Sequence, residues 1–139
     1  MNCPKKKSSG SPSEGRVLKV RTFYQVPSYQ TETKFSRARG VKYMSSRYKQ
    51  WQANFQFELD HQSDWDGETF VRCRLDVLFY QATLRRLDMD NQLKSLGDVL
   101  QETGIIEDDC WRLMRPVLLD ATHDPVSPGA EITITEILD

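Results

Sequence analysis

Long apolar runs, zinc-ligand spacing and a phosphate-binding glycine loop are all missing from this sequence of 139 residues. No apolar run approaches the ~20 residues of a membrane helix, and no hydrophobic segment follows the first lysines, so we expect a cytoplasmic protein without a membrane partner. The three cysteines and two histidines are not spaced as zinc ligands. The absence of GxxxxGK[ST] argues against a nucleotide hydrolase with such a loop.

Positive and negative charges are separated along the chain, although the formal net charge is only −1. Residues 1–50 hold twelve Lys and Arg side chains against two acids, a net of +10. Residues 51–139 hold seven against eighteen, a net of −11. One part can therefore attract phosphate while another holds cations. The alternative is that both blocks are ordinary solvated surfaces, which the size of the two opposite blocks disfavours.

Length and composition fit a single compact domain with one hydrophobic core. Residues 1–15 are rich in Ser, Pro, Lys and Gly, which predicts a flexible basic tail before a domain that spans 16–139. The segment Val26–Lys42 has turn residues, cations and aromatic side chains but no clear period. We expect it to be a long basic loop that contacts phosphate, with a mobile surface loop as the alternative.

Hydrophobic periodicity predicts four strands and two helices. The predicted strands are 16–24, 71–79, 111–119 and 129–138, and the predicted helices start at Ser45 or Ser46 and at Asp90, the second ending at Thr103 before Gly104. Pro116 cannot donate to a strand ladder and places the third strand at a sheet edge. The last two strands predict a closing hairpin. The expected class is α+β, with a mixed sheet of about four strands and two main helices packed on one face.

Asp88 and Asp90 stand two residues apart where an extended segment passes into a helix. Alternate residues of an extended chain share a side, so both carboxylates can converge on one hard cation. Magnesium takes one or two protein carboxylates together with waters and phosphate oxygens. The Asp108–Asp109 pair would complete such a site. A calcium loop counted from Asp88 is excluded, because Leu93 stands where that loop needs glycine.

Lys94 follows Asp90 by four residues and shares its edge of the predicted helix. There it is placed to hold a phosphate group and to offset charge that develops in a transition state. Gly97, on the same edge, would let a nucleic-acid backbone approach. The alternatives are an ordinary Asp–Lys helix pair and a glycine that permits close packing, and each alone is the simpler interpretation.

The whole segment resembles the RusA family of Holliday junction resolvases, which are crossover junction endodeoxyribonucleases. The resemblance is carried by Asp88-x-Asp90-Asn91, Lys94, Asp98, Gly104 and Asp108-Asp109, by the preceding strand Phe70–Phe79, and by the closing Ile132-Thr133-Ile134-Thr135-Glu136. Pro27-Ser28 matches more faintly the family's early Pro-Ser motif. Two residues depart from the family pattern: Leu87 stands where a basic residue is frequent, and Tyr29 replaces a usual asparagine.

The resemblance implies that Asp88, Asp90 and Asp109 are catalytic carboxylates that hold Mg²⁺ or Mn²⁺, with Lys94 assisting. It implies a homodimer that hydrolyses phosphodiesters of four-way or branched DNA in recombination and repair. The protein would be cytoplasmic, either bacterial or phage-encoded, and associated with the nucleoid through DNA. By inference, the DNA-contacting cations are Arg85, Arg86, Lys34, Arg37, Arg39 and Lys42, and Phe35 or Tyr43 stacks on an unpaired base. The alternatives are a non-catalytic protein that binds branched DNA on the same fold, and purely structural acids.

The reach of the chain limits how Asp109 can join the other two aspartates. A helix from Asp90 to Thr103 carries the chain ~20 Å away, and the extended segment Gly104–Asp109 recovers at most ~17 Å. We therefore expect either a shorter helix or an Asp109 that completes the site of a partner subunit.

Overall fold

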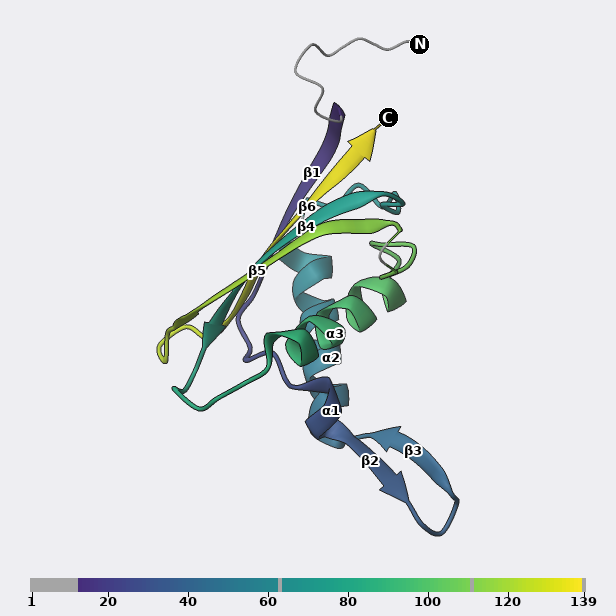
Figure 1. Cartoon of the computed structure of the whole chain (residues 1–139), viewed down its shortest axis with the longest axis vertical. Coiled ribbons are helices and arrows are strands. Elements are labelled where there is room, and N and C mark those ends of the chain that lie inside the picture. The colour runs from purple at the N-terminus through teal and green to yellow at the C-terminus, as the bar shows by residue number, and fades with distance from the viewer. Residues whose placement is uncertain (1–12, 63, 111, 139) are drawn as a thin grey trace.

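A computed structural model describes residues 13–62, 64–110 and 112–138. Four strands form one mixed sheet, two more form a separate hairpin, and three helices complete the α+β fold, which confirms the predicted class (Figure 1). The elements are β1 Ser13–Thr22, α1 Tyr29–Glu32, β2 Thr33–Ser36, β3 Val41–Met44, α2 Ser46–Gln62, β4 Cys73–Gln81, α3 Met89–Glu102, β5 Met114–His123 and β6 Gly129–Leu138. Within the described ranges, no helix has the length and apolar character required to cross a membrane.

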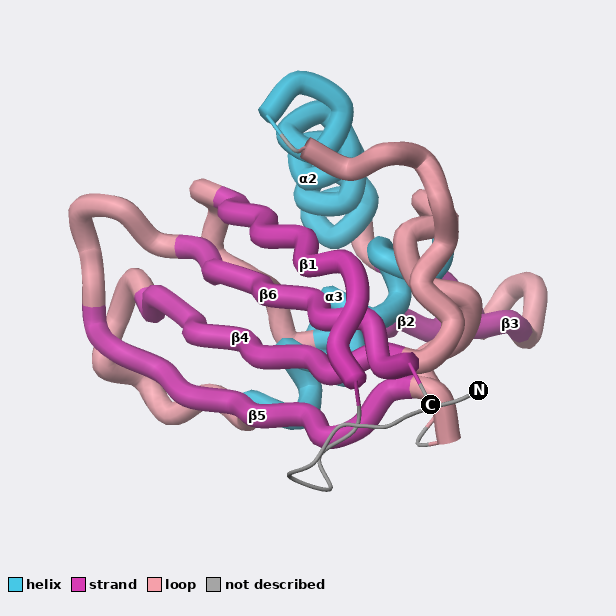
Figure 2. Tube along the Cα trace, turned by 90° about the horizontal axis from the view of Figure 1, so that it is seen from above, coloured by secondary structure: helices cyan, strands magenta, loops and turns pink. Residues whose placement is uncertain are grey.

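The strand order in the sheet is β1-β6-β4-β5 (Figure 2), which puts Pro116 on an edge strand as predicted. Strand β4 pairs in parallel with β5 and antiparallel with β6. The predicted closing hairpin is therefore wrong, because β4 lies between the two strands that were expected to pair. A parallel pair needs a long crossover, and α3 provides it. The turn after β5 then passes over the end of β4, where Asp124 N donates to Gln81 O at 2.8 Å.

One face of the sheet packs against α2 and α3 and forms the core, as predicted. Alternate residues of the strands point to this face, as the burial of Leu75, Val77 and Phe79 in β4 shows. The apolar stripe predicted for the first helix is buried in α2 and consists of Tyr48, Trp51, Phe55 and Leu59. Ser45 precedes this helix and caps it, because its hydroxyl accepts from the Tyr48 amide at 3.1 Å.

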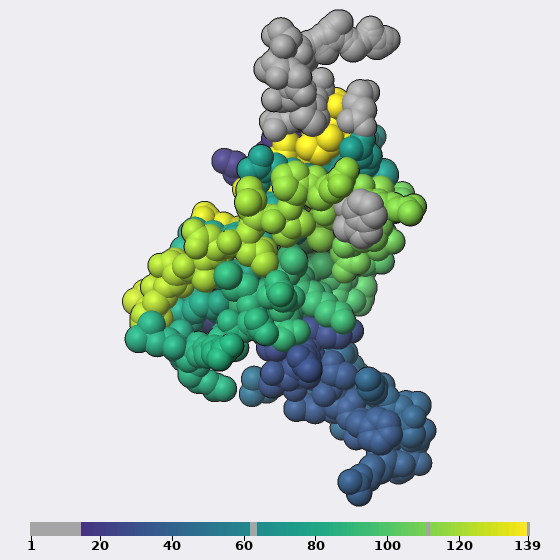
Figure 3. Space-filling model, viewed as in Figure 1, coloured from purple at the N-terminus to yellow at the C-terminus, as the bar shows by residue number. Residues whose placement is uncertain are grey.

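The segment Val26–Lys42 is not the long loop that was expected. It contains α1, β2 and the start of β3, and the two strands form an antiparallel hairpin. Gly40 closes the hairpin turn in the left-handed region, at φ 64°. We call residues 29–44 the arm, because they project away from the sheet and the two long helices (Figures 1 and 3).

Some boundaries differ from the predicted ones. Strand β1 spans Ser13–Thr22 where 16–24 was predicted, and residues 1–12 of the predicted tail lie outside the described residues. The N-cap of α3 is Asp88 rather than Asp90. Its end agrees with the prediction, since Gly104 follows at φ 85°. Trp111, where the third strand was expected to begin, is also outside the described residues.

A hydrogen-bonded carboxylate joins α2 to α3. Asp98 in α3 accepts from the Tyr48 hydroxyl at 2.8 Å and from the Gln52 amide at 2.9 Å. Burial, together with this hydrogen bond, raises the pKa of the Tyr48 hydroxyl well above its ordinary value. The phenol therefore stays protonated and keeps donating to Asp98, which holds α3 in place against α2.

Tyr48→Phe should lower the free energy of unfolding by about 1–2 kcal/mol, because a hydrogen bond to a partly buried carboxylate is lost. Tyr80→Phe is the matched control, since the Tyr80 hydroxyl donates to Glu131 at 2.6 Å on the exposed side of the sheet. The control should leave the free energy of unfolding nearly unchanged. Urea unfolding followed by circular dichroism measures both, and equal losses would contradict a special role for the Tyr48–Asp98 contact.

Candidate active site

Asp88 and Asp90 lie at the N-terminal end of α3, where an exposed segment leads from β4 into the helix. Asp88 occupies the N-cap with extended backbone angles, φ −84° and ψ 114°, but its side chain makes no capping hydrogen bond. Asp90 lies in the first turn, and both residues are exposed. Since an N-cap aspartate ordinarily accepts from the helix amides, the free Asp88 carboxylate remains available to another ligand.

This pair of carboxylates fits a hard divalent cation. Mg²⁺ and Mn²⁺ prefer oxygen donors, and magnesium needs one or two protein carboxylates besides water and phosphate oxygens. Among the described residues, no three His, Cys, Asp or Glu side chains come together as a metal-binding cluster. Within the described residues of one chain, no third side chain of these types therefore joins Asp88 and Asp90.

Asp109 lies beside the middle of α3 instead of its start. A Cβ atom on Gly97 would stand 3.1 Å from Asp109 Oδ2 and 3.4 Å from Asp109 Cβ. Gly97 is seven residues after Asp90, or about 10 Å along the helix axis. The absence of a side chain at Gly97 leaves room for Asp109. Gly97 is buried, so it does not face an approaching nucleic-acid backbone. Because α3 runs to Glu102, the expectation of a clearly shorter helix is also wrong.

Lys94 is exposed, and an aromatic ring fixes the place of its ammonium group. The Lys94 Nζ atom lies 4.9 Å from the centre of the Tyr29 ring. That ring in turn packs edge-on against Tyr48, with centroids 5.6 Å apart and planes at 90°. Tyr29 is the residue that departs from the family's Pro-Ser-Asn pattern, and here it holds Lys94 through a cation–π contact.

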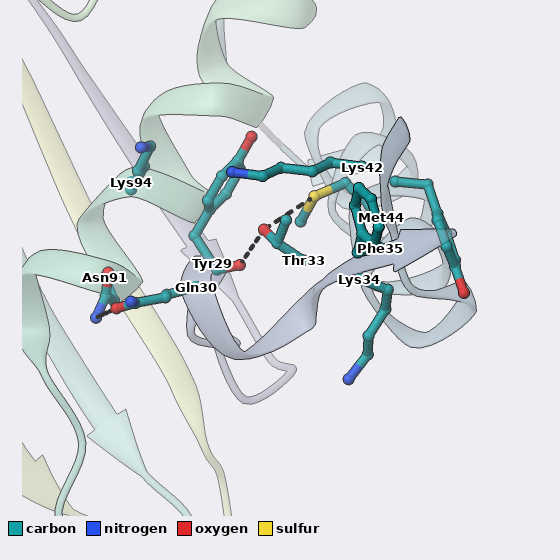
Figure 4. A pocket seen from close by; sticks show the side chains of 10 residues that line it. Tyr29, Gln30, Thr33, Lys34, Phe35, Lys42, Met44, Asn91 and Lys94 are labelled. Carbon is teal, nitrogen blue, oxygen red and sulfur yellow. Dashed lines mark hydrogen bonds between the residues drawn. The ribbon is translucent and has the colours of Figure 1, made fainter. Parts of the chain in front are cut away.

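A groove of about 740 Å³ runs between α3 and the arm (Figure 4). Asn91 and Lys94 line its α3 side, and Phe35 and Lys42 line its arm side. None of the residues that line this groove is acidic. The groove therefore presents positive charge and aromatic rings directly beside the first turn of α3, which carries Asp90.

The cations predicted to contact DNA are all exposed, but they fall into three places. Lys34 and Lys42 line the groove. Arg37 and Arg39 stand in the hairpin turn, and Arg85 and Arg86 precede Asp88. The structure thus places these cations around the groove and before Asp88, on the arm and on the segment that leads into α3.

Gln92 is a residue of the site that sequence analysis missed. Its side chain is fully buried, and its amide donates to Val26 O at 3.0 Å and to Gln81 Oε1 at 2.9 Å. The Gln81 amide donates back to Gln92 Oε1 at 2.7 Å. A detectable signal existed, because Gln92 falls on the apolar stripe of the helix between Met89 and Leu96. A buried amide in such a position needs partners, and here they join the segment before the arm to the end of β4.

Most of the chain matches a known protein family. Residues 24–135 match the family Endodeoxyribonuclease RusA, a range that extends from before the arm to within β6. The Crossover junction endodeoxyribonuclease RusA of Aquifex aeolicus is 31% identical over 77 residues, which are 55% of this chain and 60% of that relative. The match thus spans less than two thirds of the relative. Since the family match takes in the arm, both long helices and the aspartates of the site, the chain belongs to the RusA family of endodeoxyribonucleases.

Proposed function

We propose that this protein is a magnesium-dependent endonuclease that cuts four-way DNA junctions as a homodimer, in DNA recombination and repair. The observation that carries the proposal is a pair of exposed carboxylates, Asp88 and Asp90, next to a groove lined with cations and no acid. Family membership and the name of the Aquifex aeolicus relative support phosphodiester hydrolysis at crossovers. A four-way junction has two-fold symmetry, so a two-fold dimer offers one site to each of two opposing strands.

In this mechanism, Asp88 and Asp90 would hold Mg²⁺, or Mn²⁺ in its place. The ion would activate a water and offset negative charge on the phosphoryl oxygens. Lys94, four residues after Asp90 on the helix, holds an oxygen of the scissile phosphate, and Tyr29 keeps the ammonium group in position. The exposed cations of the arm hold flanking phosphates, which fixes the position of the DNA without reading its sequence.

Asp90→Asn should lower the rate of magnesium-dependent junction cleavage by on the order of 100-fold or more, because a metal ligand is lost. Asp60→Asn is the matched control, since Asp60 is an exposed aspartate on α2. Both variants are tested on a labelled four-way junction and on linear duplex, with and without Mg²⁺. Unchanged cleavage by Asp90→Asn would show that these acids are structural. Junction binding without any cutting by the wild type would leave a binding protein on a nuclease fold.

Asp109 acts, in this proposal, on the site of the partner subunit. Within one chain it lies beside Gly97, about 10 Å along the axis from Asp90, which is too far for one cation to bind both. The helix has nearly its full expected length, Met89–Glu102, so shortening the helix cannot close this gap. A second copy of the chain is the remaining source of a third carboxylate.

Mixing two inactive chains tests this arrangement. In a mixed dimer of Asp90→Asn and Asp109→Asn chains, one composite site keeps both its Asp90 and its Asp109 if Asp109 acts in the partner. We expect the mixture to regain nicking of one junction strand, at roughly a quarter to a half of the wild-type rate for statistical mixing of dimers. Each variant alone is the control. A mixture as inactive as its components would place Asp109 in the site of its own chain.

A further inference from the structure

We propose that the groove between α3 and the arm holds an unpaired nucleotide of branched DNA, with its base against the Phe35 ring and its phosphate near Lys42. This inference rests on the proposed function and deepens it, because it names the feature of the DNA that the arm recognises.

The hairpin presents an aromatic ring and a cation side by side on the face that looks into the groove. Phe35 and Lys42 are direct cross-strand partners, as are Thr33 and Met44 two pairs further along. Alternation along each strand places all four on one face of the hairpin. The Thr33 hydroxyl donates to Tyr29 O at 2.8 Å, so this face is turned toward α1 and α3 (Figure 4).

The side of the groove that α1 and α3 form, across from the hairpin, repeats this combination of a ring and an ammonium group. Tyr29 offers its ring, and Lys94 Nζ lies 4.9 Å from the centre of that ring. Figure 4 shows Lys42 extending from the arm toward Tyr29, so cations from both walls converge on the same space. Gln30 and Asn91 add amide groups at the edge, where Asn91 Nδ2 donates to Gln30 Oε1 at 3.4 Å.

The chemistry of this groove favours an unpaired nucleotide over other ligands. Cations without any lining acid attract a polyanion such as DNA and offer nothing specific to an uncharged apolar ligand. Phe35 is 58% exposed, so its ring is free to take a base on its face. Both faces of a paired base inside a duplex are covered by its neighbours, whereas an unpaired base can leave the stack and rest on a protein ring.

The groove also borders the proposed metal site. Asn91 and Lys94 line it, and Asp90 directly precedes Asn91 in the first turn of α3. A nucleotide seated against Phe35 therefore places a neighbouring phosphate at the end of the helix where Asp88 and Asp90 lie. In this way, recognition of an unpaired position would select which phosphodiester is cut.

Binding to two matched DNAs in EDTA tests the inference without any hydrolysis. One is a fully paired duplex, and the other is the same duplex with one unpaired thymidine, each followed by fluorescence anisotropy. Phe35→Ala should weaken binding of the bulged duplex by roughly five- to a hundredfold and of the paired duplex by less than about twofold, because stacking on one base is lost. Phe35→Trp should restore the preference for the bulge.

Phe57→Ala is the matched control, because Phe57 is 61% exposed on α2 and does not line the groove. It should leave binding of both DNAs unchanged. Lys42→Gln should weaken both, and should lower the slope of log affinity against log salt by about one phosphate contact. Equal weakening of the two DNAs by Phe35→Ala, or an effect of Phe57→Ala as large as that of Phe35→Ala, would overturn the inference.

The result is separable from the proposed nuclease activity. A chain that prefers the bulged duplex through Phe35 but never cuts a junction would contradict the nuclease proposal and support this inference. A chain that cuts junctions through Asp90 but binds the bulged duplex as tightly after Phe35→Ala as before would do the reverse. Circular dichroism melting of each variant shows that the fold is kept, which the exposure of Phe35 leads us to expect.

Discussion

The fully buried amide of Gln92 is the contact on which the position of the arm and of α3 depends. A buried amide left without partners costs about 1–3 kcal/mol, so its place in the core is compatible with folding only while Val26 O and Gln81 stay in reach. Val26 leads into the arm, and Gln81 ends β4. A second hydrogen bond from α3 reaches the same segment, because the Ser95 hydroxyl donates to Pro27 O at 2.8 Å. The arm, the end of β4 and the helix that carries Asp90 are therefore held as one unit. The groove between the arm and this helix keeps its shape for that reason.

Separation of charge along the sequence becomes a separation in space at the groove. The arm contains one acid, Glu32, which is buried and accepts from the Ser45 hydroxyl. The charges that the arm presents to solvent are therefore positive, while Asp88 and Asp90 stand nearby at the start of α3. DNA drawn in by the arm would meet two carboxylates that repel its phosphates. A divalent cation at those carboxylates removes this conflict, which is why the two kinds of charge belong to one proposed function.

The parts of the fold that were predictable from sequence are those with long, one-sided burial. Helix α2 and strand β4 have clear periods over nine residues or more, because one side of each faces the core. The arm has no such period: its four-residue strands are exposed or half-exposed at every position, so burial imposes no alternation on their sequence. The predicted closing hairpin was wrong for a different reason. Strands that follow each other usually pair, but the crossover through α3 placed β5 on the far side of β4, and local sequence carries no signal for that choice.

Within the site, predictability follows the same division between local and long-range geometry. The placement of Asp88, Asp90 and Lys94 at one end of α3 follows from spacing along a single element. The position of Asp109 does not, because it depends on how the chain after Gly104 folds back along the helix and on the space that Gly97 leaves. The length of the chain nevertheless limited where Asp109 could lie. After a helix of this length, too few residues remain for Asp109 to return to the start of the helix. If the third carboxylate must come from a second copy, an isolated chain lacks a complete site. Cleavage would then require an assembled dimer, and two composite sites would form together, as paired cuts in opposing strands demand.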